Sequence, residues 1–296
     1  MDLPASVAAL EEQLCGTGEI APDPELFDGA AVFAAERERI FVQPWIALDH
    51  ESRLAGDGSW FRADAAGRSL LATREPDGRL HALRNVCLHA GYPVCDAEEG
   101  PGNRLVCLYH GWEYTLDGRL VEPELSARID PARLRLPSYP IAVRDGLIFV
   151  DLSGRGDMAQ ADADPIPAWL AGAAVTRRMR YNTTWNWKFA LQFLKSSPQL
   201  FLDDVGAGES WRVFGPLSLM LVQARQAALV RVIPKFAGQT DIQLIEMTAG
   251  ERPQSPVPSD GADRVADGLL RAGAEGPPAA LDQHFFTWYW SLMSAN

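Results

Sequence analysis

Two short segments of the sequence each place a cysteine close to a histidine. The first contains Cys87 and His89, and the second contains Cys107 and His110. Thiolates and neutral imidazoles are both metal ligands, and two of each can hold a 2Fe-2S cluster, with the cysteines on one iron and the histidines on the other. The pattern Cys-x-His, seventeen residues, Cys-x2-His therefore predicts a Rieske-type cluster.

The local context of these segments favours iron-sulfur chemistry over zinc. Gly91 and Gly111 follow the histidines closely, and a residue without Cβ lets a loop approach a cluster and turn back. The alternative is a zinc site, since zinc also binds two cysteines and two histidines. Zinc fingers and ribbons usually pair Cys with Cys and His with His, whereas each segment here is mixed, so we favour the cluster.

The remaining cysteines and two further histidines lie outside this pattern. Cys15 and Cys95 have no partner motif, and we interpret Cys95 as a small buried thiol. His50 and His81 have no neighbouring Cys or acidic pattern, so we interpret both as surface or locally hydrogen-bonded residues rather than ligands.

The overall composition excludes several classes of partner. The 296 residues carry 27 Lys and Arg against 39 Asp and Glu, a net charge of −12. Nucleic acid and anionic membrane surfaces both require clustered positive charge, so neither is an expected partner. No apolar run is long enough to span a bilayer and no export signal is visible. Four cysteines do not make a disulfide scaffold, so we expect a reducing cytoplasm.

Hydrophobic patterning predicts an α+β chain in three parts. Residues 24–42 are typical of an amphipathic helix. Short β-rich runs separated by Gly, Pro and Asp turns then predict an antiparallel β module, with runs at 45–48, 69–73, 80–83, 103–108 and 146–152. Residues 153–167 are typical of a linker. The predicted parts are an N-terminal helical segment at 1–44, a cluster domain at 45–153 and a second α+β domain at 154–296.

The second half mixes predicted helices, strands and one long loop. A helix is expected around 185–202 and another over the aromatic run that ends the chain, which contains Phe285, Trp288 and Tyr289. The five prolines of 249–279 predict a long surface loop. Strand-like runs lie between these features, at 211–214, 217–223, 228–233 and 242–248.

The chain resembles the large (alpha) subunits of Rieske non-haem iron oxygenases of the ring-hydroxylating and demethylating type. The resemblance is carried by NVCLHAG at 85–91, CLYHGWEYTLDGRL at 107–120, GLIFVDL at 146–152 and TWNWK at 184–188. It implies an N-terminal antiparallel β Rieske module followed by a truncated, helix-grip-like α+β oxygenase-type domain.

The resemblance also implies a role for individual residues at the cluster. It puts Cys87 and Cys107 on a buried iron, His89 and His110 on an outer iron, and Trp112 beside the loops. Respiratory-chain Rieske proteins are similar in their ligands but carry a hydroxyl residue where this chain has Trp112. Hydrogen bonds to the sulfurs favour the reduced cluster, so the absence of that donor predicts a potential low in the Rieske range.

The resemblance breaks at the second metal of the family, a mononuclear iron held by two histidines and one carboxylate. In the family pattern, both histidine positions are counted from Lys188. The first falls on Gln199 or Leu200, and the second on Asp204 or Val205. The position of the linking carboxylate falls on Ser196 or Ser197. His284 is the only histidine after residue 153. The resemblance therefore implies that mononuclear Fe(II) is absent. Another metal arrangement would have to use Asp203, Asp204, Asp282 and His284. We disfavour it, because adjacent acids such as Asp203 and Asp204 are usually solvated.

These features predict an electron-transferring component rather than a complete oxygenase. The resemblance implies a hetero-oligomeric, trimeric or hexameric ring in which a catalytic alpha-type subunit supplies the missing iron site, with a ferredoxin or flavin reductase as the electron donor. The alternatives are a self-sufficient oxygenase with atypical iron ligands and a non-catalytic structural or redox-sensing subunit. We do not expect oxygenase activity from the chain alone.

Overall fold

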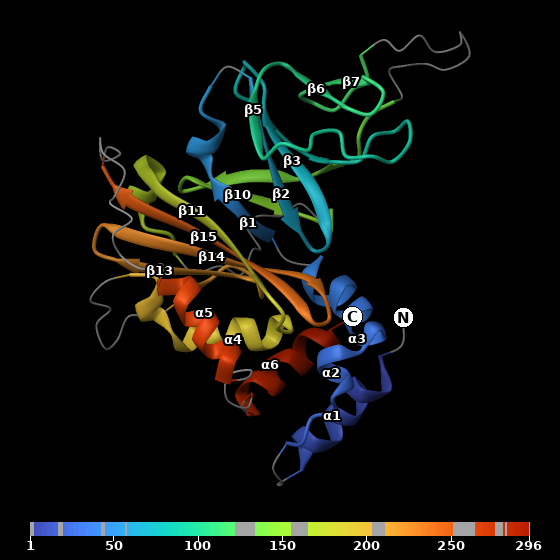
Figure 1. Ribbon diagram of the computed structural model, residues 1–296, viewed down its shortest axis with the longest axis vertical. Coiled ribbons are helices and arrows are strands. Elements are labelled where there is room, and N and C mark those ends of the chain that lie inside the picture. The colour runs from blue at the N-terminus through green and yellow to red at the C-terminus, as the bar shows by residue number, and fades with distance from the viewer. Residues whose placement is uncertain are drawn as a thin grey trace. The chain divides into compact units, whose positions relative to one another are not determined.

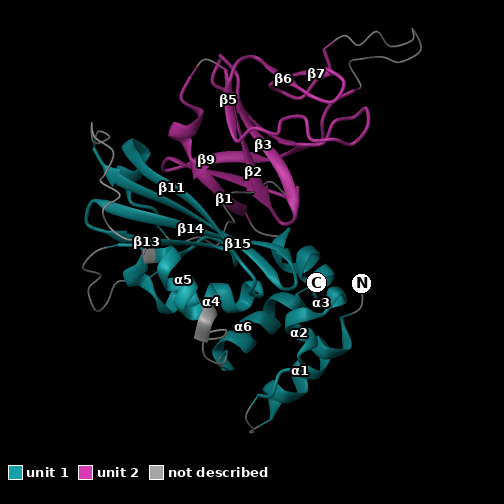
Figure 2. Cartoon of the chain, viewed as in Figure 1, with its two compact units in different colours: residues 1–44, 161–296 teal, residues 45–160 magenta. Residues whose placement is uncertain are grey.

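The computed structural model describes residues 3–16, 20–42, 45–56, 58–121, 134–154, 165–202, 211–250, 264–275, 281 and 283–295. It forms two units, and Figure 2 colours them separately. One comprises residues 45–160; the other joins residues 1–44 to residues 161–296. The three-part division expected from the sequence stays a prediction, and the structure differs from it in grouping the N-terminal helices with the second half.

The unit of residues 45–160 consists of antiparallel strands, as the sequence predicts. A three-stranded sheet has the order β1-β10-β9, with β1 at Trp45–His50, β10 at Leu147–Asp151 and β9 at Ile141–Arg144. A five-stranded sheet has the order β5-β2-β3-β4-β8, formed by Glu99–Pro101, Ser59–Ala65, Arg68–Arg74, Leu80–Arg84 and Ser138–Tyr139. A separate hairpin pairs β6 with β7, at Arg104–Val106 and Glu113–Thr115.

The hairpin between β3 and β4 shows how the turn residues set this register. Asp77 and Gly78 lie at its tip, and Gly78 has a φ of 88°, a left-handed conformation that glycine adopts without a Cβ penalty. The backbone N–H of Gly78 donates to Glu75 O at 2.9 Å. The strands on either side are then in register, so Leu71 pairs with Leu83 in the core of the unit.

The other unit is a five-stranded antiparallel sheet with helices on one face. The strand order is β11-β15-β14-β13-β12, formed by Ala173–Thr183, Gln239–Ala249, Gln226–Phe236, Ser218–Gln223 and Arg212–Val213. Helix α4, at Trp187–Ser196, packs on β14 and β15. Figure 1 shows α5, at Arg264–Glu275, and α6, at Gln283–Ser294, on the same side of the sheet.

Several sequence predictions for this unit need correction. The helix expected over 24–42 is interrupted at Gly29, whose extended backbone separates α2 at Glu25–Asp28 from α3 at Ala30–Glu36. Helix α3 continues directly into the π-helix η1 at Arg37–Phe41. The helix expected over 185–202 ends at Ser196 and is followed by the short 3-10 helix η6 at Pro198–Leu200. The long strand β11 was not expected at all.

The loop expected over 249–279 is wrong for its central part, where α5 forms. Val265 is buried, and Gly268 lies so close to Leu200 that a Cβ on it would come within 2.9 Å of the Leu200 side chain. The prolines that suggested a loop flank this helix rather than interrupt it. The rest of the expected loop lies outside the described residues, apart from Ala249 and Gly250 at its start.

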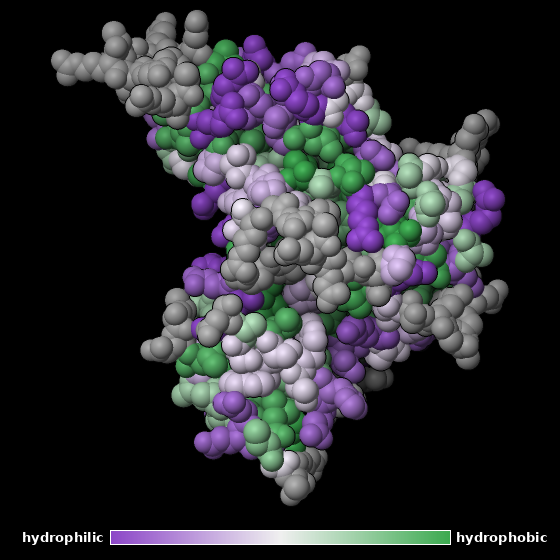
Figure 3. Space-filling view, turned by 180° about the vertical axis from the view of Figure 1, so that it is seen from behind, coloured by the Kyte–Doolittle hydropathy of each residue, from purple (hydrophilic) through white to green (hydrophobic). Residues whose placement is uncertain are grey.

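The remaining helix is α1, at Ala5–Cys15, which contacts α6. Two further 3-10 turns occur, η2 at Glu51–Leu54 and η5 at Ala168–Gly172. Within the described ranges, none of the helices combines the length and apolar character needed to cross a bilayer. Figure 3 shows hydrophilic residues interspersed with apolar ones over the face opposite to that of Figure 1.

A buried charge network joins three distant segments of the unit formed by residues 1–44 and 161–296, which we call the helical unit. Lys188 Nζ forms an ion pair with Glu36 and donates to Leu26 O at 2.6 Å. Glu36 also accepts hydrogen bonds from Trp187 Nε1 and from the Tyr289 hydroxyl, each at 2.8 Å. Burial lowers the pKa of Lys188, and the charge of Glu36 opposes that shift. The network fastens the N-terminal helices to α4 and α6.

Candidate metal centre

The four predicted ligands lie on two loops with matching backbone geometry. We name them loop 1, residues 87–92, which follows β4, and loop 2, residues 107–112, which joins β6 to β7. In each loop the cysteine N–H donates to the carbonyl five residues later, at 2.7 Å in loop 1 and 2.8 Å in loop 2. The glycine N–H four residues after the cysteine donates back to the cysteine carbonyl, at 3.0 and 2.8 Å.

Both glycines have the left-handed backbone conformation that closes these turns. The φ angles are 75° at Gly91 and 73° at Gly111. A Cβ built at either position would meet no protein atom within 4 Å. In the protein itself, the reason for glycine is therefore the positive φ rather than close packing.

The loops direct their thiols inward and their imidazoles outward. Cys87 and Cys107 are 3% and 2% exposed and belong to one buried core cluster. His89 and His110 are exposed, and their ring centroids lie 4.5 Å apart. This donor set, a buried thiol pair and an adjacent surface imidazole pair, fits a Rieske cluster, in which each iron takes one pair.

A single metal ion fits this arrangement less well. Among the described residues, no three Cys, His, Asp or Glu side chains gather closely enough to hold one ion. A 2Fe-2S cluster makes no such demand, because each iron needs only two protein ligands.

Aromatic side chains support the two histidines. The Trp112 ring stacks on His89 with centroids 4.8 Å apart and planes 12° apart. Tyr109 lies 4.0 Å from His110 and stacks on Tyr92 at 3.9 Å. The position of Trp112 matches the one implied by the resemblance, since it also packs against the core cluster.

Tyr114 supplies a hydroxyl group that the sequence analysis missed. Its ring is fully buried, and its hydroxyl lies 3.2 Å from Cys87 Sγ. The same oxygen accepts a hydrogen bond from the Leu88 N–H at 3.0 Å, which leaves its own proton to donate to the sulfur when Cys87 is a thiolate. Burial raises the pKa of Tyr114, so the hydroxyl keeps that proton at neutral pH.

This hydroxyl adds a donor to sulfur that the sequence-based expectation of a low potential did not include, and the potential itself stays a prediction. Position 112, where respiratory-chain Rieske proteins carry a hydroxyl residue, holds Trp112 in this chain. The donor stands two residues later, on β7, and alternation along a strand turns its side chain toward the core while Glu113 is exposed. The available signal was the tyrosine of the run HGWEY.

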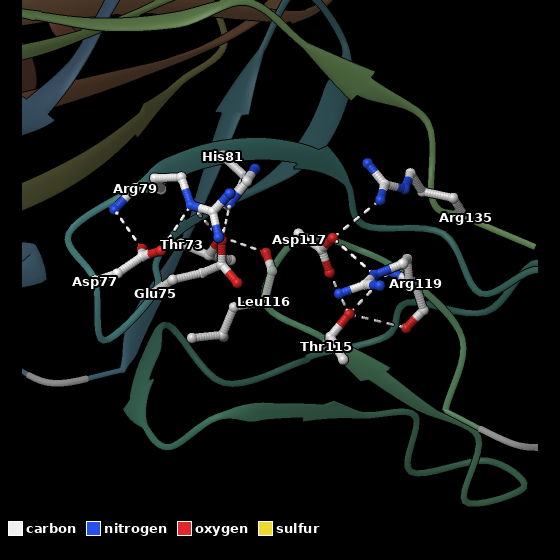
Figure 4. A network of polar contacts seen from close by, with 10 residues as sticks. All are labelled: Thr73, Glu75, Asp77, Arg79, His81, Thr115, Leu116, Asp117, Arg119 and Arg135. Carbon is white, nitrogen blue, oxygen red and sulfur yellow. Dashed lines mark hydrogen bonds and ion pairs between the residues drawn. The ribbon is translucent and has the colours of Figure 1, made fainter. Parts of the chain in front are cut away.

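Polar contacts hold the turn that follows Tyr114. Asp117 accepts a hydrogen bond from Thr115 and pairs with Arg119 and Arg135, each at 2.9 Å (Figure 4). Burial opposes ionisation of Asp117, but the Thr115 hydrogen bond and the two arginines lower its pKa below the ordinary value. Thr73 on β3 donates to Leu116 O at 2.6 Å and ties this turn to the five-stranded sheet.

The other cysteine of this unit is buried, and its two other histidines make local polar contacts, as the sequence predicts. Cys95 is buried, and burial raises the pKa of its thiol to about 11. His50 lies 2.9 Å from Ser52 Oγ, and His81 lies 2.8 Å from Glu75. His81 and Glu75 form part of the network in Figure 4, with Arg79 and Asp77.

The positions where the family pattern expects an iron site lie at the end of α4 and beyond. Ser196 is the last residue of α4, and its hydroxyl donates to Phe193 O at 3.0 Å. Gln199 and Leu200 lie in η6. His284 is exposed in the first turn of α6. The acidic candidates and the remaining histidine position lie outside the described residues, namely Asp203, Asp204, Val205 and Asp282.

Comparison with known proteins identifies the domain that carries the two loops and the fold of the chain. The family described as Rieske [2Fe-2S] domain matches residues 44–140. The chain is also 26% identical over 208 residues to the biphenyl 2,3-dioxygenase subunit alpha of Rhodococcus jostii (strain RHA1), covering 64% of this chain and 43% of that protein. The chain therefore contains a Rieske [2Fe-2S] domain and is homologous to Rieske oxygenase alpha subunits.

A second relative and a solved structure extend the comparison. The glycine betaine monooxygenase oxygenase subunit of Pseudomonas aeruginosa (strain UCBPP-PA14) is 31% identical over 124 residues, covering 41% of this chain and 29% of that protein. This chain therefore spans less than half the length of these two relatives. The apo form of the quaternary ammonium Rieske monooxygenase CntA has the same fold, with a TM-score of 0.73, 16% identity, and 99% of this chain and 98% of that chain covered.

Proposed function

We propose that this chain is an electron-transferring, alpha-like subunit of a heteromeric non-haem iron oxygenase. The complex would hydroxylate an aromatic ring or remove a methyl group from nitrogen or oxygen. One observation carries the proposal: the two loops retain a complete set of cluster ligands, while the positions for mononuclear iron ligands hold no histidine. The similarity to subunits of a biphenyl dioxygenase and a glycine betaine monooxygenase supports the oxygenase class.

We assign the cluster ligands on the donor chemistry of the two loops. Cys87 and Cys107 would hold one iron in the core, and His89 and His110 would hold the other at the surface. When bound, a Rieske cluster takes up and releases one electron at a time. The chain's own residues orient these ligands: Trp112 fixes the plane of His89 by stacking, and Tyr114 hydrogen-bonds to the sulfur of Cys87.

The imidazole side of the site is the side that a partner protein can reach. Among the described residues, five of the eight exposed large apolar side chains lie on the two loops or directly before loop 2: Leu88, Tyr92, Val106, Leu108 and Tyr109. Leu108 is 83% exposed. An exposed apolar cluster of this kind is typical of an interaction surface. We assign it to docking of a catalytic alpha-type subunit in a trimeric or hexameric ring.

The proposed partner supplies what this chain lacks. An oxygenase iron needs two histidines and a carboxylate that leave positions open for oxygen and substrate. The second half of this chain contains a single histidine, His284, which is one fewer than such a site needs. We therefore propose that this chain binds no mononuclear Fe(II) and that a ferredoxin or flavin reductase delivers its electrons.

The test is co-expression of this chain with an alpha-type subunit that has an intact iron site. We expect a complex that forms product with reductase and reductant, and His110→Ala in this chain alone should reduce product per reductant at least tenfold. His81→Ala is the matched control, because His81 is a histidine of the same unit that bonds only to Glu75 among its described partners. Unchanged product yield from the His110→Ala complex would exclude electron delivery and favour a structural or redox-sensing role.

One observation favours the second candidate, a self-sufficient oxygenase with atypical iron ligands. The fold likeness to CntA extends over 99% of this chain, so it includes the second half. Iron analysis separates the two functions, since two irons per chain support the electron-transfer role and three support the self-sufficient enzyme.

A further inference from the structure

The side chain of Asn85, two residues before Cys87, holds both ends of loop 1. It is 2% exposed. Its Oδ1 accepts hydrogen bonds from the backbone N–H groups of Val94 at 2.9 Å and Cys95 at 3.0 Å. Its Nδ2 donates to Cys95 O at 2.8 Å and to Ser69 Oγ at 3.1 Å. One carboxamide thus uses its full hydrogen-bonding capacity, and three of the four bonds go to the segment that follows loop 1.

The two loops differ in what closes them. Loop 2 lies between β6 and β7, whose backbone ladder pairs Leu105 with Tyr114 and Val106 with Glu113. Loop 1 follows β4, but residues 93–98 after it form no strand. A buried backbone N–H needs a partner, and at Val94 and Cys95 the Asn85 side chain takes the place that a paired strand has in loop 2.

The clamped segment also contacts the second loop. The Cys107 thiol lies 3.6 Å from Pro93 O, directly before the two residues that Asn85 binds. The position of residues 93–95 therefore affects the surroundings of Cys107 as well as the return path of loop 1. Through these contacts, Asn85 affects the placement of Cys87 and Cys107 without contacting either thiol.

We propose that Asn85 is a positioning residue for the cluster: its carboxamide fixes loop 1 and the Pro93–Cys95 segment so that the two thiols keep their relative placement. The proposal rests on the proposed cluster function of the loops. It makes a specific demand, because only a side chain with an acceptor and a donor on one planar group satisfies the Cys95 N–H and the Cys95 carbonyl together.

The test compares Asn85→Ala with Thr73→Val in the full chain. Both remove buried hydrogen bonds from the same unit, but Thr73 bonds to Leu116 O, beyond loop 2. We expect Asn85→Ala to lower cluster content several-fold, to shift or broaden the electron paramagnetic resonance signal of the reduced protein, and to speed amide exchange in residues 92–98 at least tenfold. Thr73→Val should leave the signal and that exchange unchanged.

Two results would overturn the proposal. One is an unchanged resonance signal and unchanged exchange in Asn85→Ala; the other is an equal change of signal in Thr73→Val, which would show a general response to destabilisation. If Asn85→Ala does not fold, Asn85→Asp decides. It keeps the acceptor but loses both donations, so exchange near Cys95 should rise and the signal should broaden, whereas wild-type behaviour would contradict the role. An altered signal in Asn85→Ala, together with a wild-type chain that delivers no electrons to the partner, would leave the positioning role standing and reject the proposed function.

Discussion

The two units of this chain use their buried polar groups for different purposes. In residues 45–160, Tyr114 and Asn85 contact the loops that carry the candidate ligands, and they leave the histidines exposed. In the helical unit, Lys188 and Glu36 pair in the core and contact no candidate ligand among their described partners. The first set shapes a site for chemistry, and the second holds distant segments together.

The comparison teaches that the positions of an expected metal site can lie apart from the core that holds the fold. The sheet of the helical unit has five strands in the order β11-β15-β14-β13-β12, and α4 packs on it. The family pattern places its iron ligands at and beyond the end of α4, and those positions contribute little to the described core, since Ser196, Gln199 and Leu200 are not buried. Function and stability are therefore separable here, and four predictions test that separation.

The largest expected effect is on the cluster. Replacing Cys107 by Ser should abolish the visible absorbance and the Rieske resonance signal, because the buried iron would lose one of its two thiolate ligands. Circular dichroism should still show the strands and helices of the other unit. Cys95→Ser is the matched control and should keep the cluster. A full Rieske signal in Cys107→Ser would show that the ligand assignment is wrong.

The next effect is on the stability of the helical unit. Lys188→Met leaves Glu36 buried without its cation and should lower the free energy of unfolding of this unit by about 3 kcal/mol. Urea titration followed by tryptophan fluorescence measures it, and the cluster signal should persist below the transition. Adding Glu36→Gln should recover part of the loss, since the charge is then removed from both sides. A double variant as unstable as the sum of the singles would contradict a direct pairing.

A smaller effect is expected on the reduction potential. Tyr114→Phe removes the hydroxyl beside Cys87 Sγ, and since a hydrogen bond to sulfur favours the reduced cluster, the midpoint potential should fall. If the hydrogen bond stabilises the reduced cluster by about 1 kcal/mol more than the oxidised cluster, its loss lowers the potential of this one-electron couple by about 40 mV. Potentiometric titration measures the shift, with Tyr109→Phe as the control on the exposed side. A potential unchanged by Tyr114→Phe would mean that the hydroxyl does not bond to the sulfur.

The smallest effect concerns Asp117. Its pKa is lowered in the folded protein, so its contribution to stability is present above the unfolded pKa of about 3.9 and is lost as the pH falls through the folded pKa. Asp117→Asn should remove that part of the acid dependence. We expect the substitution to lower the free energy of unfolding at neutral pH by about 1 kcal/mol or less. Urea unfolding at pH 3 to 7 measures it. An acid-unfolding profile identical to wild type would show that Asp117 does not stabilise the turn after β7.

Local spacing along the chain determined much of the candidate site. The Cys-x-His and Cys-x2-His segments, their glycines and the antiparallel β module follow from residues within a few positions of each other, because turns and strand alternation are local properties. The missing histidines were also visible from composition alone, since His284 is the only one in the second half. The strand expected over 103–108 was nearly right, and it ends at Val106 so that Cys107 begins loop 2.

Only the tertiary structure decided which distant groups meet. The sequence places Tyr114 27 residues after Cys87, and nothing in that spacing shows that its hydroxyl bonds to the sulfur of Cys87 rather than to a group on loop 2. Glu36 and Trp187 are 151 residues apart, and their hydrogen bond depends on how α3 and α4 pack. The sequence predicts a loop where α5 forms, because the flanking prolines are visible in the sequence, whereas the packing of α5 against Leu200 is not. These contacts depend on strand register and helix packing, which arise from the whole chain rather than from any local pattern.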